Sequence, residues 1–217
     1  MSKFELLKNE EFSVRERKRA LREYMKEKRG EIVNRDVKEE RLMENFFELL
    51  NEAGKKDARV FFVYASYSSE VRTDKLIEAL ERAGKTVYCP RIEGGEMLAV
   101  ELGDDFTLSA FGTLEPVGEP YEGEIDVCVV PLLAVDKKGN RLGYGKGFYD
   151  RFLAARNTLS VGYCFDVQVL NDVPTEEGDI PLQAVATENK RFFVEKKLKE
   201  TANKRDALTK RNEGEKV

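Results

Sequence analysis

The feature that most constrains the fold is an alternation of uninterrupted apolar runs with amphipathic segments. The apolar run RVFFVYAS (59–66) is followed by TDKLIEALERAG (73–84), which has a threonine start and a glycine stop, and then by KTVYCPRI (85–92). These segments predict a strand, a helix and a strand. Further apolar runs predict strands at 97–102, 124–136 and 159–165. Such strands, alternating with helices, indicate a mainly parallel sheet covered on both faces.

Helical patterns flank these strands. Ser13 and Glu16 form a capping box, which predicts a helix beginning there, and a second helix is expected at about 36–52, ending at Gly54. A short helix is expected at 148–157. The predicted fold is therefore α/β: a three-layer α/β/α arrangement with the N-terminal helical pair packed against the sheet.

The domain organisation follows from a change of composition near the C-terminus. Residues 1–194 are expected to form a single α/β domain, whereas residues 195–217 are strongly charged and poor in apolar side chains. We expect this tail to be helical or disordered, and a docking or nucleic-acid role is the alternative.

Composition narrows the chemistry and the compartment. The chain carries 36% charged residues but a net charge of only −4, which argues against a general affinity for nucleic acid or membranes. Three cysteines in apolar surroundings, with no recognisable signal or membrane-spanning segment, predict reduced thiols and a cytoplasmic protein. The 217 residues contain no histidine, so proton transfer would need carboxylates, lysine, tyrosine or water. A monomer is the default expectation.

A glycine-rich segment lies between the most apolar run and the short helix. In GNRLGYGKGFYDR (139–151), Gly143, Gly145 and Gly147 occupy alternate positions. Glycines at this spacing let backbone N–H groups converge on an anion, and ligand crevices form where strands of an open α/β sheet end. We expect the segment to bind a phosphate group. The alternative is that it forms a purely structural turn.

Charged side chains in this segment favour a nucleotide. Lys146, with Arg141 and Arg151 at the edges, can neutralise phosphates, and Asp150 can hold a divalent cation. The segment is not a Walker A loop, because Gly147 follows Lys146. Its third glycine also comes too early for a dinucleotide fingerprint.

The segment NRLGYGKGFYDRFL, following PLLAVDKKG, closely resembles the signature of the 5-formyltetrahydrofolate cyclo-ligase family. The resemblance extends from about residue 13 to residue 188. Its further landmarks are KRALR (18–22), YASYSSEVRTDKLI, CPRIEGGEML, GTLEP and VPTEEGDIPLQAVATE.

The resemblance implies an ATP- and Mg²⁺-dependent conversion of 5-formyltetrahydrofolate to 5,10-methenyltetrahydrofolate, with release of ADP and phosphate. The formyl oxygen would attack the γ-phosphate, after which a neighbouring nitrogen closes the ring. An amide oxygen needs no deprotonation to act in this way, which suits a chain without histidine.

The resemblance also assigns roles to residues. Lys146 and Arg141 are implied as catalytic residues, and Asp150 and Asp179 as magnesium ligands. The implied ATP-binding residues are Lys18, Arg22, Arg141, Leu142, Gly143, Tyr144, Gly145, Lys146, Gly147, Phe148 and Tyr149. The implied folate-binding residues are Ala65, Glu70, Met97, Phe111, Tyr144 and Phe148.

Each role has a structural alternative. Glu70 suits a helix start, Met97 suits a core, Asp179 suits a turn, and Lys18 and Arg22 suit a solvated helix face. Two other functions compete with the cyclo-ligase. One is a non-catalytic nucleotide-, folate- or RNA-binding module on the same scaffold, and the other is an ATP-dependent enzyme acting on a different heterocycle.

Overall fold

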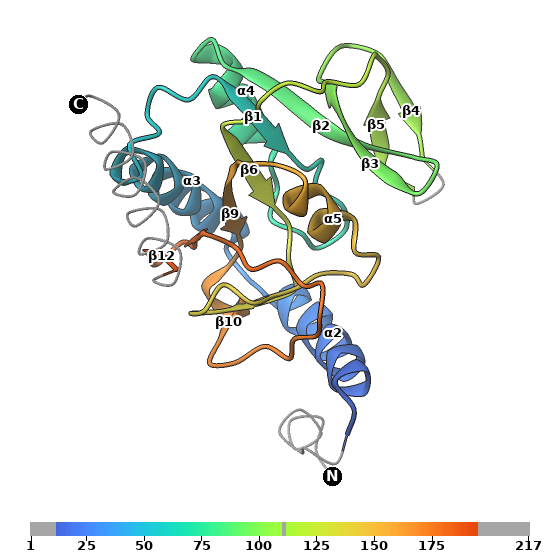
Figure 1. The fold of residues 1–217 in the computed structure, drawn as a ribbon. Coiled ribbons are helices and arrows are strands. Elements are labelled where there is room, and N and C mark those ends of the chain that lie inside the picture. Colours follow the sequence, from blue (N-terminus) through green and yellow to red (C-terminus); the bar gives the residue numbers. More distant parts are fainter. Residues whose placement is uncertain (1–11, 110–111, 195–217) are drawn as a thin grey trace, which may run out of the picture.

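A seven-stranded sheet forms the centre of the molecule (Figure 1). The computed structural model describes residues 12–109 and 112–194. The strand order is β12-β11-β9-β6-β1-β2-β3, in which the five strands from β11 to β2 are parallel and the two edge strands are antiparallel to their neighbours. The strands are β1 (Val60–Val63), β2 (Thr86–Glu93), β3 (Glu96–Glu101), β6 (Val127–Val130), β9 (Leu159–Tyr163), β11 (Ala184–Ala186) and β12 (Arg191–Phe193).

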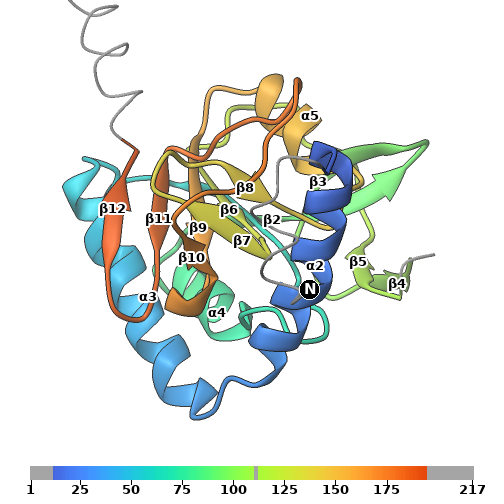
Figure 2. The same cartoon turned by 90° about the horizontal axis from the view of Figure 1, so that it is seen from below.

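Helices cover both faces of this sheet (Figures 1 and 2). On one face, α3 (Arg35–Glu52) and α4 (Asp74–Arg82) bury Leu42, Phe46, Leu76 and Leu80 against the strands. On the other face, α5 (Phe148–Ala154) buries Phe152 and Leu153 against a second set of strand side chains. The three-layer α/β/α fold with a mainly parallel sheet is thus confirmed.

The two N-terminal helices pack on different sheets. While α3 covers the main sheet, α2 (Val14–Gly30) lies on a three-stranded sheet of β10 (Val169–Leu170), β7 (Ala134–Asp136) and β8 (Arg141–Leu142) (Figure 2). Leu21 and Met25 of α2 are almost fully buried there, against Leu133 and Leu142. The Ser13–Glu16 capping box begins α2, as predicted.

The most apolar run, expected as one strand at 124–136, forms two. β6 ends at Val130 and continues the main sheet, whereas β7 begins at Ala134 and joins the small sheet. Pro131 lies between them, and a proline has no N–H with which to continue the ladder. The break turns the chain from the main sheet to the small one, so the segment that follows emerges beside α2.

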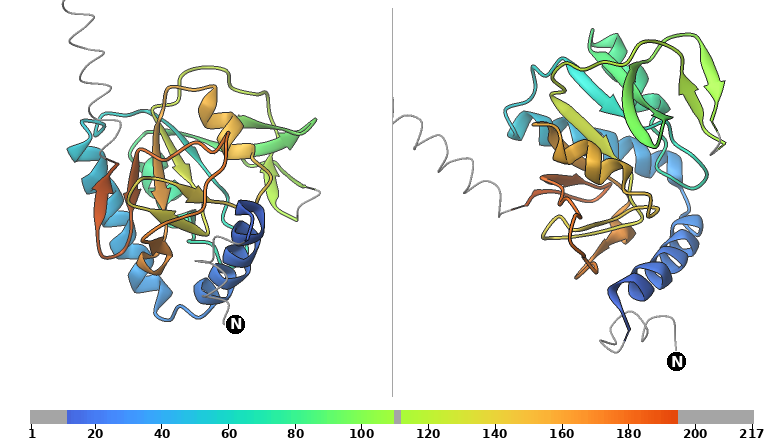
Figure 3. Two further views of the ribbon diagram at one scale, coloured as in Figure 1. Left: turned by 60° about the horizontal axis from the view of Figure 1, so that its bottom comes forward. Right: turned by 45° about the vertical axis from the view of Figure 1, so that its right-hand side comes forward.

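A two-stranded ribbon of β4 (Phe106–Leu108) and β5 (Leu114–Pro116) stands at one side of the molecule (Figure 3). It was not predicted from the sequence. All three cysteines are buried and unpaired, as expected. No helix among the described residues is long and apolar enough to cross a membrane. The charged tail at 195–217 lies outside the described residues, so the domain boundary stays a prediction.

Candidate active site

A cavity of about 250 Å³ opens where the glycine-rich loop, α2 and α5 meet. Every residue that the sequence assigned to ATP or magnesium lines it, so Lys18 and Asp179 meet the loop despite their distance along the chain. Pro131 and Glu176 complete the wall. The predicted folate residues Tyr144 and Phe148 belong to the same lining.

The glycine-rich loop depends on backbone conformations that favour glycine. Gly145 (φ +92°) and Gly147 (φ +68°) both lie in the left-handed region. A Cβ atom on Gly145 would approach the guanidinium of Arg22 to 3.0 Å. Gly145 therefore permits both the turn of the loop and its close contact with α2.

Two cations on α2 face the cavity. Lys18 and Arg22 are four residues apart, which places them on one face of the helix. Arg22 Nε donates to the carbonyl oxygen of Gly143 (2.9 Å), and burial lowers the pKa of Arg22. Lys18 is only 4% exposed, and its Nζ donates to Glu176 Oε1 (2.8 Å) and Asp179 Oδ2 (2.6 Å). The solvated-face alternative is thus wrong for Lys18.

Asp150 and Asp179 carry the carboxylates that were predicted to hold magnesium. Asp150 Oδ1 accepts from Arg141 Nη2 (2.8 Å) and from the backbone N–H of Ile180 (3.2 Å). Asp179 Oδ2 accepts from Lys18 and also from the N–H of Glu176 (2.8 Å), so Asp179 closes a turn as well. Within the described residues, these bonds engage one oxygen of each carboxylate.

The carboxylates of this cavity fit a Mg²⁺ ion that also has phosphate ligands. The described residues contain no group of three or more acidic or cysteine side chains placed to hold a metal ion. Two carboxylates on one cavity wall suit Mg²⁺ when phosphate oxygens and water supply its other ligands. The residues thus fit a magnesium ion that arrives with a phosphate compound.

Glu70 lies in the loop that follows β1, and its side chain is 7% exposed. Its Oε2 accepts from the N–H of Tyr67 (2.9 Å). Burial raises the pKa of Glu70, although the N–H of Tyr67, the charge of Arg29 and the nearby Tyr144 act in the opposite direction. The same Tyr144 lines the cavity, so Glu70 lies next to the glycine-rich loop.

Arg29 is a residue of this region that was not predicted. It is 2% exposed, and its guanidinium donates to the Tyr144 hydroxyl (2.6 Å) and to Ser69 Oγ (3.1 Å). Its signal in the sequence is helical spacing, because residues 18, 22 and 29 recur every four and seven positions on one face of α2. Glu176 was also missed, and only the fold brings it near Lys18.

The remaining predicted residues lie elsewhere. Met97 of β3 lines a second cavity of about 560 Å³, beside Tyr121 and the end of α5, and does not line the first. Ala65 is half-buried in the loop after β1 and lines neither cavity. Phe111 lies outside the described residues. Tyr149 lines the first cavity but also packs into the core, with its ring 6.2 Å from that of Phe62.

The fold and this cavity define an α/β protein whose site is built for an anionic ligand, with cations and paired carboxylates around a glycine-rich loop. The model of the 5-formyltetrahydrofolate cyclo-ligase family matches residues 14–188. The chain belongs to that family, and the resemblance seen in the sequence is confirmed. It is therefore an enzyme, a ligase of folate one-carbon metabolism.

Individual relatives agree with this assignment. The chain is 37% identical over 145 residues to the 5-formyltetrahydrofolate cyclo-ligase of Escherichia coli, covering 61% of this chain and 80% of the relative. It is 34% identical to that of Haemophilus influenzae, covering 61% and 78%. The NMR structure of Aquifex aeolicus 5,10-methenyltetrahydrofolate synthetase matches with a TM-score of 0.72 at 29% identity, covering 82% of this chain and 93% of that one.

Proposed function

We propose that the enzyme uses Mg-ATP to convert 5-formyltetrahydrofolate to 5,10-methenyltetrahydrofolate, releasing ADP and phosphate. The observation that carries this proposal is the lining of the first cavity. Four cationic side chains surround it together with the two carboxylates suited to Mg²⁺: Lys18, Arg22, Arg141 and Lys146. A triphosphate with its metal ion matches this mixture of charges better than a neutral ligand does.

The loop would bind the triphosphate through its backbone. Residues 143–147 contain three glycines, so no Cβ atom at these positions shields the N–H groups from a phosphate. Lys146 lies within this loop and would neutralise the transferring phosphoryl group, and Arg141 would do so from the base of the loop. Lys18 and Arg22 would contact the remaining phosphates from α2.

The reaction would proceed in two balanced steps. The formyl oxygen attacks the γ-phosphorus, a P–O bond forms, and the bond to the ADP oxygen breaks. The neighbouring exocyclic nitrogen then attacks the formyl carbon, its C–O bond breaks, phosphate leaves with the electron pair, and the nitrogen loses its proton. The protein would contribute positioning and charge neutralisation rather than a strong base.

Asp150 and Asp179 would hold the magnesium ion. A bound Mg²⁺ would supply neutralisation of charge on the phosphate oxygens. In the present structure, Lys18 and Arg141 lie against these carboxylates at 2.6 Å and 2.8 Å. We infer that these cations turn toward the phosphates when the nucleotide arrives.

The folate would bind beside the nucleotide, against Glu70. Its carboxylate can accept hydrogen bonds from the amino and amide groups of a pterin. Tyr144 is 43% exposed, so its ring offers surface for stacking, and Phe148 adds apolar surface on the cavity wall. Met97, Ala65 and Phe111 remain predicted folate contacts.

The decisive test mixes purified protein, Mg-ATP and 5-formyltetrahydrofolate and follows the absorbance of the methenyl product. We expect product to form with stoichiometric release of ADP and phosphate. Omitting ATP, or adding EDTA, should stop the reaction. A folded protein that forms no product would overturn the proposal and favour the non-catalytic module, and turnover without ATP would overturn the nucleotide assignment. Monomeric state and cytoplasmic location stay predictions.

A further inference from the structure

Arg29 lies between the part of the site assigned to the nucleotide and the part assigned to the folate. Its Nη2 donates to the hydroxyl of Tyr144, which belongs to the glycine-rich loop (2.6 Å). Its Nε donates to Ser69 Oγ (3.1 Å), next to Glu70. Its Nη1 donates to the carbonyl oxygen of Leu132 (3.2 Å), just after β6. One buried guanidinium therefore ties the two binding segments to each other and to the end of the central sheet.

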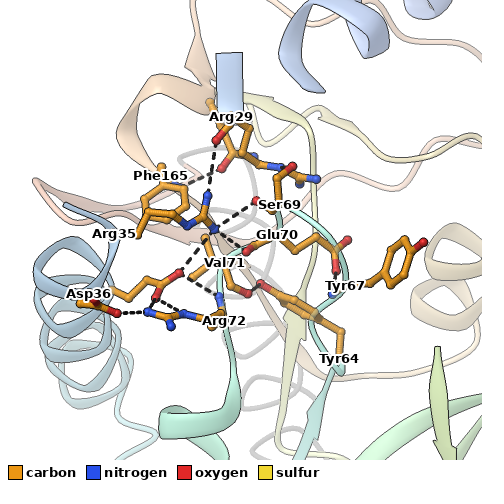
Figure 4. A network of polar contacts seen from close by, with 12 residues as sticks. Arg29, Arg35, Asp36, Tyr64, Tyr67, Ser69, Glu70, Val71, Arg72 and Phe165 are labelled. Carbon is orange, nitrogen blue, oxygen red and sulfur yellow. Dashed lines mark hydrogen bonds and ion pairs between the residues drawn. The ribbon is translucent and has the colours of Figure 1, made fainter. Parts of the chain in front are cut away.

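A second arginine holds the same folate segment from α3. Arg35 Nη2 donates to the carbonyl oxygens of Ser69 (3.1 Å) and Glu70 (2.6 Å), as Figure 4 shows. Ser68 in this segment has φ +56°, a conformation that residues other than glycine seldom adopt. The two arginines thus hold a constrained turn, and Arg29 is the one that also reaches the glycine-rich loop.

The contact with Arg29 also orients the hydroxyl of Tyr144. A phenol has one proton, and its oxygen accepts the bond from Arg29, so that proton is available to a different acceptor. Burial and the nearby charge of Glu70 raise the pKa of Tyr144, which places the Glu70 carboxylate beside this hydroxyl. The contacts run from the glycine-rich loop through Tyr144 to Arg29, and from Arg29 to Ser69, the neighbour of Glu70.

We propose that Arg29 is a positioning residue that couples the two substrates: a nucleotide that orders the glycine-rich loop fixes Tyr144 and, through Arg29 and Tyr144, the segment carrying Glu70. This inference rests on the function proposed above. The physical basis is that a segment ordered by the first ligand does not have to be ordered again when the second one binds. Because linkage is reciprocal, folate must strengthen nucleotide binding by the same factor.

The test is a calorimetric measurement of coupling. The dissociation constant of a non-hydrolysable ATP analogue with Mg²⁺ is measured with and without saturating 5-formyltetrahydrofolate, and the reverse titration checks reciprocity. We expect a coupling factor of roughly 10 in the wild-type enzyme, within the usual range for linked sites. Arg29→Met and Tyr144→Phe should each bring the factor to within about twofold of unity. Arg29→Lys keeps the charge and should retain part of the coupling.

Lys28→Ala is the matched control, because Lys28 neighbours Arg29 on α2 but is partly exposed and pairs with Glu31. It should leave the coupling factor unchanged. Loss of the buried Arg29 guanidinium could prevent folding, so Tyr144→Phe, at a 43% exposed position, carries the test independently. If Arg29 had a merely structural role, Arg29→Met would lower the affinity for each ligand and leave the coupling factor unchanged.

Three results would overturn the inference alone: a wild-type enzyme that turns over substrate yet shows no coupling, coupling that survives in a folded Arg29→Met variant, or coupling that survives in Tyr144→Phe. A wild-type enzyme without turnover in the absorbance assay would instead overturn the proposed function, and this inference with it. The two failures are therefore distinguishable.

Discussion

Asp136 and Asp150 lie on either side of β8, each in a polar segment that contains glycine, yet their carboxylates have different surroundings. Asp136 is fully buried, and both of its oxygens are engaged. Oδ1 accepts from the N–H groups of Lys138 (2.8 Å) and Asn140 (3.0 Å). Oδ2 accepts from Asn140 Nδ2 (2.9 Å) and the N–H of Val173 (3.1 Å). Among residues 12–109 and 112–194, Asp150 accepts hydrogen bonds through Oδ1 alone, and it lines the cavity.

The difference separates a structural carboxylate from one available to a ligand. Asp136 stabilises a turn because the protein itself supplies donors for both of its oxygens. Asp150 keeps acceptor capacity on Oδ2 and lines a cavity together with cations that would attract a phosphate. The motifs DKKGN and YGKGFYD each combine an aspartate with lysine and glycine in the sequence. Only the fold shows which of them satisfies its own polar groups.

The largest expected effect is a loss of turnover on changing a residue of the cavity that contains Asp150. Lys146→Ala should lower kcat by roughly 10³-fold, because it removes a cation assigned to the transferring phosphoryl group. The midpoint of urea unfolding should stay unchanged, since Lys146 is exposed. Lys137→Ala, an exposed lysine of the Asp136 turn, is the control and should retain full activity. Unchanged turnover in Lys146→Ala would remove this residue from the mechanism.

The second largest expected effect is a loss of stability on changing Asp136, the structural carboxylate of the comparison. Asp136→Ala should lower the free energy of unfolding by about 3 kcal/mol, because it leaves several buried donors without an acceptor. Urea unfolding measures the loss. Asp172→Ala, which breaks only the exposed pair with Lys138, should cost less than about 1 kcal/mol. If Asp136→Ala were equally mild, the distinction between the two carboxylates would fail.

A smaller effect should follow from filling the loop. Gly145→Ala would strain a backbone at φ +92° and displace Arg22, so we expect nucleotide affinity to fall by about 10-fold and stability by about 1–2 kcal/mol. Gly84→Ala is the matched control, because Gly84 also has a positive φ but its Cβ would meet nothing within 4 Å. It should lower stability without weakening nucleotide binding. Equal affinity in both variants would argue against the loop as the phosphate site.

The smallest effect concerns the pH dependence of stability through Glu70. Burial raises its pKa above 4.5 in the folded state, so the folded protein holds this proton more firmly than the unfolded chain. Its contribution to stability is therefore lost as the pH rises from about 4.5 through the folded pKa. Glu70→Gln should flatten the decline over that window in urea unfolding experiments. Glu119→Gln, at an exposed position, controls for the lost charge, and an identical slope in Glu70→Gln would contradict the prediction.

The fold could be predicted where apolar runs are long enough to show a pattern. Four of the five parallel strands (β1, β2, β6 and β9) and the four helices follow from such runs and from the capping box at Ser13. β11 and β12 were missed because each has three residues, too few for a periodicity. The break at Pro131 was missed because the residues on both sides are apolar, and the sequence does not say that they belong to different sheets.

The site could be predicted where its groups are local in sequence. The glycine-rich loop brings its own glycines and charges, and the resemblance supplied Lys18, Glu70 and Asp179. Arg29 was missed because a cation in the last turn of a helix ordinarily complements the helix dipole. Only tertiary packing places its guanidinium against Tyr144 and Ser69.

Helix α2 fixes the distance and the relative orientation of the side chains of Lys18 and Arg29. Lys18 and Arg29 stand eleven positions apart on one straight element, which corresponds to a separation of about 16 Å along the axis. Inserting or deleting a single residue between them would rotate everything beyond it by about 100° and move one of the two side chains away from its partners. Insertions and deletions in natural variants of this enzyme should therefore avoid the interval from 18 to 29 and collect in the 31–34 connection, where no such register has to be kept.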